Sequence, residues 1–285
     1  MRLANVDGRA VLLTADDRGI DVAAASDGKF GPELPSLYGD WDGFRVWADS
    51  AADRAGDVRF VRAQLGSPSP APRQVVAIGL NYRAHAAESG FDAPGDLPPT
   101  FTKFVSSLSG PDTEVVLPAG GHTDWEVELV VVIGRTAHRT PVERAWDHVA
   151  GLAVGQDLSE RVSQLAGPAP QFSLGKSFPG FAPVGPWLVT PDEVPDRDDL
   201  ALGCAIDGQT VQDGRTKDLI FPVAALISKL SAALTLYPGD LIFTGTPAGV
   251  GVGREPQRFL QPGETLRSWV EGIGELRQTF TAEGA

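Results

Sequence analysis

One segment near the middle of the chain constrains the fold more than any other, because it combines alternating acids with a β-branched run. Asp124-Trp125-Glu126-Val127-Glu128 continues directly into Leu129-Val130-Val131-Val132-Ile133-Gly134. The apolar half is typical of a strand that is buried on both faces. Because side chains of a strand alternate between its faces, we expect Asp124, Glu126 and Glu128 to share one face.

Carboxylates that lie side by side at the end of a buried strand repel one another unless a positive charge lies between them. A divalent cation held by oxygen ligands supplies that charge, so the pattern indicates a metal site. The residues alone leave a second interpretation open, in which the strand end is exposed and its carboxylates are solvated.

A third carboxylate follows another apolar segment. Asp157 comes after Val149-Ala150-Gly151-Leu152-Ala153-Val154, which is predicted to be a strand. An acid in this position is a candidate third ligand, although a helix cap or a turn explains Asp157 equally well. Three carboxylates that leave room for water suit the hard cations Mg²⁺ or Mn²⁺, with Ca²⁺ as a further candidate.

Composition and charge restrict the class of partner. The chain has 285 residues, of which 42% are hydrophobic and 21% charged, and its formal net charge is −13. Such an acidic chain is poorly suited to nucleic acid or to an anionic membrane surface, and no apolar run approaches the ~20 residues of a membrane span. An anionic substrate would need a local positive site, which a metal and one or two basic side chains provide.

Cysteine usage and the N-terminus bear on localisation. Cys204 is the single cysteine, so an intramolecular disulfide is excluded. Residues 1–8 lack the apolar core of a secretory signal. We therefore expect the protein in the cytoplasm.

A Pro- and Ser-rich stretch, residues 66–73, predicts a linker between a small N-terminal domain, residues 1–65, and a larger domain, residues 74–285. In the small domain we expect strands at 10–14 and 20–24, a turn at 16–19 and a helix at 49–64. In the larger domain we expect a buried strand at 74–80 and helices that begin at Thr140 and Pro222. Short strands, few helices and frequent turn residues favour an α+β, mainly β fold.

His85 and Glu88 are three residues apart in a predicted short helix, so both side chains would lie on one face. A carboxylate beside an imidazole raises its basicity and fixes its tautomer, as a general base requires. An ordinary ion pair on a helix surface explains the same spacing. Residues 91–99, rich in Gly, Pro and Asp, are typical of a mobile loop and would suit a lid.

Two glycine motifs are incomplete. Gly175-Lys176-Ser177 resembles the end of a phosphate-binding loop, but Pro170 stands where the loop's first glycine should be. Residues 249–253 resemble a dinucleotide-binding loop, but Arg254 replaces its third glycine. These departures argue against nucleotide binding. No His and Cys spacing indicates a zinc site.

Five motifs, taken in chain order, resemble the fumarylacetoacetate hydrolase family. They are residues 79–82 with His85 and Glu88, residues 124–129, residues 155–161, residues 174–178 and residues 239–251. The resemblance covers about residues 73–280. It implies a β-roll-like, metal-dependent catalytic domain with a small N-terminal domain, and usually a homodimer.

The resemblance also assigns roles to individual positions. It implies that Glu126, Glu128 and Asp157 are the metal ligands and that His85 and Glu88 are a dyad that activates water and lies on a lid ordered by substrate. It implies that Lys176 contacts the reacting oxygen, and that the substrate contacts are Arg161, Gln164 and Thr246, the last near the substrate's carboxylate.

Three positions depart from the family's pattern. Ile78 stands where some members have a fourth acidic ligand, and Gln156 replaces the usual Asn before the third ligand. Pro168 falls on or near a substrate-contacting Tyr of some hydrolases. The distal half of the substrate is therefore not carried over from those enzymes.

The expected activity is Mg²⁺- or Mn²⁺-dependent hydrolysis of a carbon–carbon bond in an acylpyruvate-type or related β-diketo acid, through a metal-stabilised enolate. The substrate would be a small anionic 2-oxo acid. Decarboxylation of an oxaloacetate-like acid, or isomerisation or hydration of a 2-oxo-dienoate, would use the same residues. A metal-dependent binding protein without activity is a further alternative, which the presence of both His85 and Glu88 disfavours.

Overall fold

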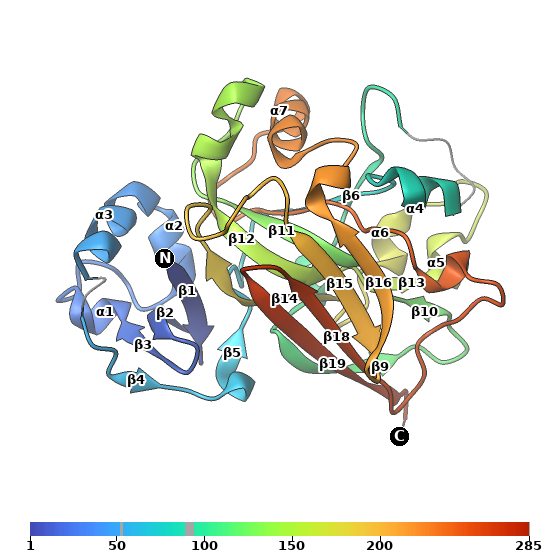
Figure 1. Cartoon of the computed structure of the whole chain (residues 1–285), viewed down its shortest axis with the longest axis horizontal. Helices are drawn as coiled ribbons and strands as arrows, with labels where there is room; N and C mark the ends of the chain where they lie inside the picture. The colour runs from blue at the N-terminus through green and yellow to red at the C-terminus, as the bar shows by residue number, and fades with distance from the viewer. Residues whose placement is uncertain (52–53, 89–93, 285) are drawn as a thin grey trace.

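A computed structural model describes residues 1–51, 54–88 and 94–284 of the chain. Within these residues two large β-sheets form the body of the molecule, and short helices lie around them (Figure 1). The mainly β, α+β fold expected from the sequence is confirmed.

The larger sheet runs from the N-terminal region through the centre of the molecule. Its strands, in spatial order, are β4 (Val58–Arg59), β3 (Arg18–Asp21), β2 (Arg9–Ala15), β1 (Arg2–Val6), β14 (Ala182–Val189), β12 (Val149–Gln156), β11 (Val127–Ile133), β17 (Leu241–Phe243), β6 (Val75–Ile78) and β7 (Thr100–Thr102), with β5 (Leu65–Gly66) on β1 and β8 (Leu108–Ser109) on β14. The central strands β14, β12, β11 and β17 are antiparallel neighbours, whereas β17 and β6 are parallel.

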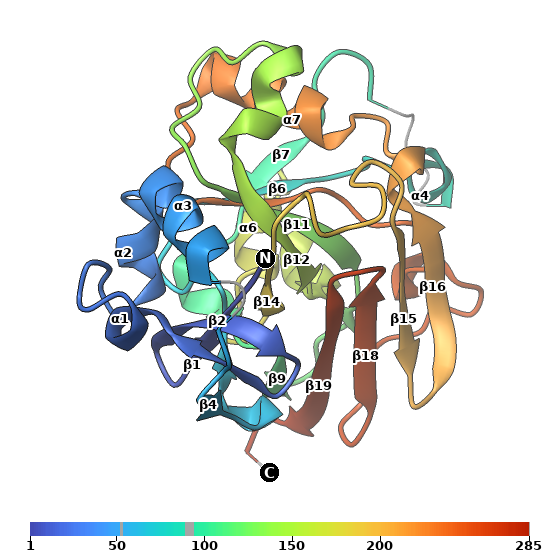
Figure 2. The same cartoon turned by 60° about the vertical axis from the view of Figure 1, so that its left-hand side comes forward.

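The second sheet packs against the first. Its strands, in spatial order, are β16 (Gln209–Arg215), β15 (Ala201–Ile206), β18 (Thr265–Val270), β19 (Gly274–Ala282) and β9 (Asp112–Leu117). Figure 2 shows β15, β16, β18 and β19 side by side as a layer distinct from β11 and β12. A separate pairing joins β10 (Thr123–Asp124) to β13 (Ser159–Glu160).

Strand β11 is the predicted buried strand, and it contributes to a core on each face. All seven of its residues are buried. Leu129 and Val131 pack into a core shared with the second sheet. Val130 and Val132, on the opposite face, pack into a core shared with the N-terminal helices. The near-continuous apolar run follows from this burial on both faces.

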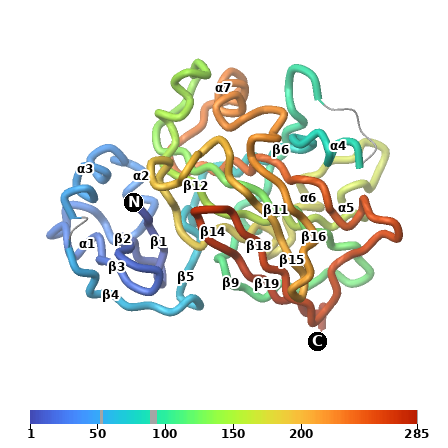
Figure 3. Tube along the Cα trace, viewed as in Figure 1, coloured from blue at the N-terminus to red at the C-terminus, as the bar shows by residue number. Residues whose placement is uncertain are grey.

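The N-terminal region continues the larger sheet. Strand β1 pairs with β14, with Leu3 opposite Leu188. Helices α1 (Val22–Ala25), α2 (Leu34–Tyr38) and α3 (Trp41–Ala51) follow, and Trp41 and Phe44 of α3 are buried in the core that includes Leu3. Figure 3 shows this region at one end of the molecule. The division at residues 66–73 into two domains stays a prediction.

The remaining helices are short except for one. They are α4 (Arg83–Glu88), α5 (Arg161–Gln164), α6 (Phe172–Gly175) and α7 (Val223–Ala233), with 3-10 turns at Arg62–Gln64, Val105–Ser107, Val142–His148, Thr216–Asp218 and Gly251–Gly253. Helix α7 begins after Pro222 as predicted and buries Leu226, Ile227 and Leu230. No helix in residues 1–51, 54–88 and 94–284 has both the length and the hydropathy for a membrane crossing.

Three local predictions were wrong. A helix was expected at 49–64, but α3 ends at Ala51 and Val58 pairs with Gly19 of β3. Residues 52–53 of the predicted helix lie outside the described residues. The strand expected at 20–24 stops at Asp21, because that side chain accepts a hydrogen bond from the N–H of Ala24 and starts α1. The helix expected from Thr140 is a 3-10 helix over Val142–His148.

Burial in α3 predicts how strongly the N-terminal region contributes to stability. Phe44 is fully buried and its ring contacts the rings of Phe30, Trp41 and Trp47. We expect Phe44→Ala to lower the free energy of unfolding by about 3–5 kcal/mol, measured by urea denaturation. Val46, on the same helix, is 73% exposed, so Val46→Ala should change it by less than about 0.5 kcal/mol. Equal effects of the two substitutions would contradict the packing of α3.

Candidate metal centre and active site

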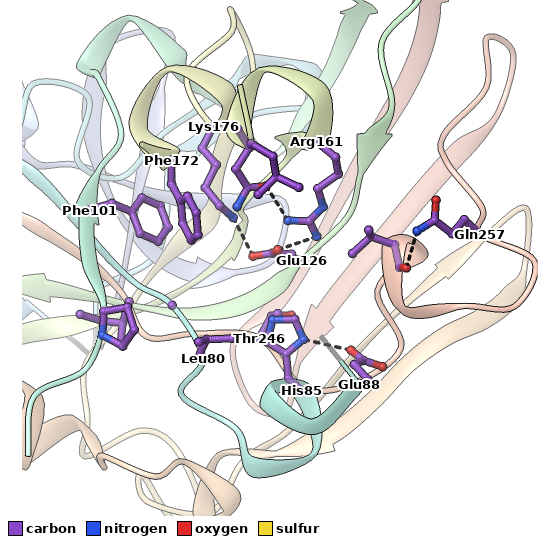
Figure 4. A pocket seen from close by; sticks show the side chains of 16 residues that line it. Leu80, His85, Glu88, Phe101, Glu126, Arg161, Phe172, Lys176, Thr246 and Gln257 are labelled. Carbon is purple, nitrogen blue, oxygen red and sulfur yellow. Dashed lines mark hydrogen bonds and ion pairs between the residues drawn. The ribbon is translucent and has the colours of Figure 1, made fainter. Parts of the chain in front are cut away.

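A cavity of about 580 Å³ opens where β11 begins and β12 ends. Its wall contains seven of the nine predicted site residues: His85, Glu88, Glu126, Arg161, Gln164, Lys176 and Thr246. The other two, Glu128 and Asp157, do not line it. Figure 4 shows Lys176 and Arg161 pointing at Glu126 from one side, with His85 and Glu88 on the other. Residues far apart in the chain therefore meet around one space.

The three predicted metal ligands form one cluster. Glu126 precedes β11, Glu128 is its second residue and Asp157 follows β12. The register that pairs Glu128 with Gly155 aligns the ends of the two strands, and the N–H of Asp157 donates to the carbonyl of Glu126 over 2.8 Å. One oxygen of each of the three carboxylates lies within 4.8 Å of the others, and all three residues are buried. The solvated strand end is therefore excluded.

Asp124 lies outside this cluster. It belongs to β10, and its carboxylate contacts Arg161 at 2.7 Å. The same guanidinium nitrogen lies 2.7 Å from a Glu126 oxygen. Arg161 thus separates Asp124 from the three clustered acids.

Two buried lysines offset part of the cluster's negative charge. The ammonium of Lys176 lies 2.8 Å from Glu126 and 2.7 Å from Asp157. The ammonium of Lys103 lies 2.5 Å from the other Asp157 oxygen. Burial acts to raise the pKa of Glu126, but the charges of Lys176 and Arg161 outweigh it and hold that pKa below its usual range.

Glu128 has no such counter-charge. One of its oxygens accepts a 2.7 Å hydrogen bond from the N–H of Gly245, and the other has no partner among the described residues. Burial, together with the charges of Asp157 and Glu126, raises the pKa of Glu128 well above its usual range. An unpartnered, fully buried carboxylate oxygen beside two further carboxylates fits a hard divalent cation, and the oxygen-only donor set favours Mg²⁺ or Mn²⁺.

Across the cavity, α4 presents the predicted pair. His85 Nδ1 lies 2.9 Å from a Glu88 oxygen, and both residues line the cavity. The side chain of His85 is 8% exposed, so the pair is not an ordinary ion pair on a helix surface. The lid predicted at residues 91–99 lies partly outside the described residues; Pro99, at its end, lines the cavity.

The incomplete Gly175-Lys176-Ser177 motif has a packing role. A Cβ on Gly175 would lie 2.6 Å from the backbone nitrogen of Gln164, so only glycine lets α6 approach α5 this closely. The approach brings Lys176 to the acid cluster while Gln164 accepts a 2.9 Å hydrogen bond from Arg161. The motif is a close helix contact rather than part of a phosphate site.

Thr246 reaches the cavity with its hydroxyl already in use. The hydroxyl donates to the carbonyl of Val127 over 2.9 Å and accepts from Gln212 over 2.8 Å. If Thr246 contacts a substrate carboxylate, its backbone N–H is the donor that it can offer. Gln212 also accepts from the N–H of Val127 at 3.0 Å, so one buried amide connects β16 to the start of β11.

The three departures from the family pattern have clear positions. Ile78 lines the cavity as an apolar residue, so the cluster keeps three acids. Gln156 accepts from the N–H of Glu126 at 2.9 Å and donates to Ser268 at 2.9 Å, which fixes the backbone of a predicted ligand. Pro168 is exposed and is not part of the cavity wall.

Sequence reasoning missed several residues of the site. Lys103 is 1% exposed and its ammonium also donates to the carbonyl of Lys176. Lys103 directly follows β7 and lies between Phe101 and Phe104 in the sequence, which is the local signal that it offered, because a lysine that is buried needs an acidic partner. The cavity also contains Phe101, Phe172 and Gln257 (Figure 4), for which the sequence carried no local signal.

Comparison with known proteins agrees with the family that the sequence motifs resemble. The family model described as Fumarylacetoacetate (FAA) hydrolase C-terminal matches residues 74–281. A curated relative, 2,4-didehydro-3-deoxy-L-rhamnonate hydrolase of Sphingomonas sp. (strain SKA58), is 48% identical over 217 residues, or 75% of each chain.

Solved structures resemble the whole chain. A crystal structure from Mycobacterium smegmatis, described provisionally as HpcE, is 57% identical, covers 99% of each chain and has a TM-score of 0.93. Maleylpyruvate hydrolase from Sphingobium sp. SYK-6, solved with manganese(II) and pyruvate, is 31% identical, covers 99% of each chain and has a TM-score of 0.80. Other similar structures carry isomerase names.

The unpartnered oxygen of Glu128 generates a prediction for metal binding. Mn²⁺ at 100 times its dissociation constant should raise the free energy of unfolding by about 2.7 kcal/mol. We expect Glu128→Gln to remove most of this increase, because the cluster loses a ligand charge. In EDTA the variant should be at least as stable as the wild type, because a neutral amide is easier to bury than an unpaired carboxylate.

Urea denaturation with Mn²⁺ and with EDTA measures both effects. Asp240→Asn is the matched control: Asp240 is also fully buried, but it accepts from Gln74 and Tyr237, neither of which lines the cavity. That variant should keep the increase due to Mn²⁺. An undiminished increase in Glu128→Gln would exclude Glu128 as a ligand.

Proposed function

This chain belongs to the fumarylacetoacetate hydrolase family, and we propose that it hydrolyses a carbon–carbon bond in an acylpyruvate-type or related β-diketo acid with Mg²⁺ or Mn²⁺. One observation carries the proposal: Glu126, which belongs to a buried cluster of three acids with an unpartnered oxygen, lies in the wall of one cavity with a paired histidine and glutamate. Relatives named as hydrolases, and one solved with manganese and pyruvate, support it.

The metal would be held by Glu126, Glu128 and Asp157. When bound, the cation would act as a Lewis acid toward the carboxylate and keto oxygens of a 2-oxo acid. The basic side chains beside the cluster would also stabilise the negative charge that develops in the transition state.

The proton transfer is assigned to α4. His85 would take a proton from water, and Glu88, 2.9 Å from its Nδ1, would fix the tautomer and stabilise the imidazolium. The resulting hydroxide would attack the distal carbonyl of the substrate. The bond between that carbon and C3 would then break, its electron pair would leave with the 2-oxo acid fragment as an enolate, and the proton on His85 would pass to C3 of that fragment to give pyruvate and a carboxylic acid. Because the pair and Glu126 of the acid cluster line the same cavity, a small substrate there would lie between the pair and the cluster.

Substrate binding is assigned to the residues on α5 and α6. The ammonium of Lys176 would stabilise negative charge on the reacting oxygen, and Arg161 would hold the carboxylate of the 2-oxo acid. Gln164, which contacts Arg161, and the N–H of Thr246 would complete these contacts.

The same residues support a second class of activity, in which water does not cleave a carbon–carbon bond. Decarboxylation of an oxaloacetate-like acid, or isomerisation or hydration of a 2-oxo-dienoate, needs the same negative charge to be stabilised. The isomerase names of some similar structures favour keeping this alternative. The activities differ in their products: hydrolysis gives two carbon fragments, decarboxylation gives CO₂, isomerisation gives a product of unchanged mass, and hydration gives a product heavier by one water.

The charges in the cavity support a proposal for the distal end of the substrate. Its two basic residues, Lys176 and Arg161, both contact Glu126. Among the described residues of the wall, the other titratable side chains are His85, Glu88 and Glu126 itself, and the rest are apolar or neutral, including Phe101, Phe172 and Leu165. The sequence has no Lys or Arg at positions 89–93. We therefore propose a substrate whose distal group is uncharged, because a second carboxylate would lack a basic partner.

The assembly and location are also proposals. The family resemblance supports a homodimer, which light scattering would test. The single cysteine supports a cytoplasmic protein.

Product analysis tests the proposed activity. With Mn²⁺ or Mg²⁺ and a series of 2-oxo acids, we expect loss of the enol absorbance of an acylpyruvate and release of pyruvate and a carboxylic acid, identified by mass. His85→Ala should lower kcat by at least about 100-fold and keep the Mn²⁺-dependent increase in stability. Release of CO₂ alone would support the alternative, and full activity of His85→Ala would exclude His85 as the base.

A matched pair of substrates tests the distal group. We expect a 2,4-dioxo acid with a terminal methyl group to have a kcat/KM at least about tenfold above that of a diacid of the same chain length, because an unpaired buried carboxylate costs several kcal/mol. Leu165→Lys, which adds a cation to the cavity wall, should narrow this ratio. Val162→Lys is the control, since Val162 is similarly exposed but does not line the cavity. A diacid preferred by the wild type would contradict the proposal.

A further inference from the structure

The glycine-rich segment 249–253 donates its backbone N–H groups to two acids from separate elements. The N–H of Gly249 lies 2.9 Å and 3.1 Å from the two oxygens of Glu88, on α4. The N–H groups of Gly251 and Val252 lie 2.6 Å and 3.0 Å from the two oxygens of Asp124, on β10. The segment that resembles an incomplete dinucleotide loop therefore joins two side chains of the protein itself.

Asp124 is more than a partner of this loop. It is fully buried, and its carboxylate also accepts from the N–H of Trp125 at 2.8 Å. Two guanidinium nitrogens of Arg161 donate to it over 2.9 Å and 2.7 Å. Arg161 in turn lies 2.7 Å from Glu126 of the acid cluster. A continuous series of contacts thus runs from Glu88 through the loop and Asp124 to Arg161.

The loop tolerates only glycine at two of its positions. A Cβ on Gly251 would lie 1.9 Å from the carbonyl oxygen of Arg258 and 2.8 Å from Asp124. Gly249 has a φ of +108°, and a Cβ there would lie 2.2 Å from the carbonyl oxygen of Val211. The backbone is therefore held closely against its neighbours, and its N–H groups have fixed directions.

We propose that Asp124 is a positioning residue that couples Glu88 to Arg161 through the segment 249–253. Glu88 orients His85 on one side of the cavity, and Arg161 faces the acid cluster on the other. By binding both the loop and Arg161, Asp124 keeps the two sides in one relative geometry. Neither the acid cluster nor the dyad includes Asp124, so this role is separate from metal binding and proton transfer.

Asp124→Asn tests the coupling with little change in side-chain volume. An asparagine replaces one acceptor oxygen by an NH₂ donor that faces N–H or guanidinium donors, so part of the network is lost. Asp240→Asn is the matched control, because it makes the same change at a fully buried acid whose partners are outside the cavity wall.

Hydrogen exchange measured by mass spectrometry reads the coupling without any substrate. We expect exchange in peptides that cover residues 249–253 and residues 83–88 to rise by at least about tenfold in Asp124→Asn and to keep wild-type rates in Asp240→Asn. Residues 83–88 do not contact Asp124, so unchanged exchange there alongside a faster loop would overturn the proposal.

A second variant approaches the same coupling from the other end. Glu88→Gln changes a partly exposed side chain and is expected to fold even if Asp124→Asn does not. Because coupling is reciprocal, it should raise exchange at Gly251 and Val252, which bind Asp124 and not Glu88. Exchange that rises only at Gly249 would overturn the coupling.

Kinetics add a readout that rests on the proposed function. Asp124→Asn should raise KM through Arg161 and lower kcat through His85. In the double variant Asp124→Asn with Glu88→Gln, the fold-decrease in kcat/KM should be smaller than the product of the two single decreases. A merely structural role would lower kcat in proportion to the folded fraction, with KM unchanged and the effects multiplicative. If the wild type turns over no 2-oxo acid, the proposed function fails, while hydrogen exchange still decides the coupling.

Discussion

Three carboxylates are buried together where β11 begins and β12 ends, and the rest of the site is arranged around the energetic cost of that burial. Lys176 and Lys103 contact two of these acids, Glu126 and Asp157. Glu128 contacts neither lysine and keeps one oxygen without a partner among the described residues. Buried charges persist only when they are paired, so the protein alone leaves an imbalance that a divalent cation would remove.

The sheet supplies the geometry that brings the three acids together. Gly155, opposite Glu128, leaves the space above Val130 and Phe243 that a Cβ would fill, at 2.4 Å and 2.8 Å. Gly245, at a φ of +101°, directs its N–H toward Glu128. The two glycines thus let the acids approach one another. Side chains held by strands are also positioned more rigidly than side chains on loops.

The sequence correctly predicted the features that depend on local patterns of residues. The near-continuous β-branched run was sufficient to predict β11, and the alternation of strand side chains placed Glu126 and Glu128 on one face. Asp157 and Lys103 depend on strand register and on contacts between distant segments, so the residues left Asp157 ambiguous and gave Lys103 no role. The helix predicted at 49–64 failed because Val58 pairs with β3, a tertiary contact that overrides helix propensity. The family resemblance, rather than spacing, supplied Arg161, Gln164 and Thr246.

The two sides of the cavity differ in what holds them. Glu128 lies on β11, and Glu126 and Asp157 directly adjoin the ends of β11 and β12, whereas His85 and Glu88 lie on α4, a helix of six residues. A helix this short is unstable by itself in water, so its position depends on contacts such as the one between Glu88 and the N–H of Gly249. Changes in α4 or in the segment 249–253 can therefore alter the placement of His85 while the acid cluster stays as it is.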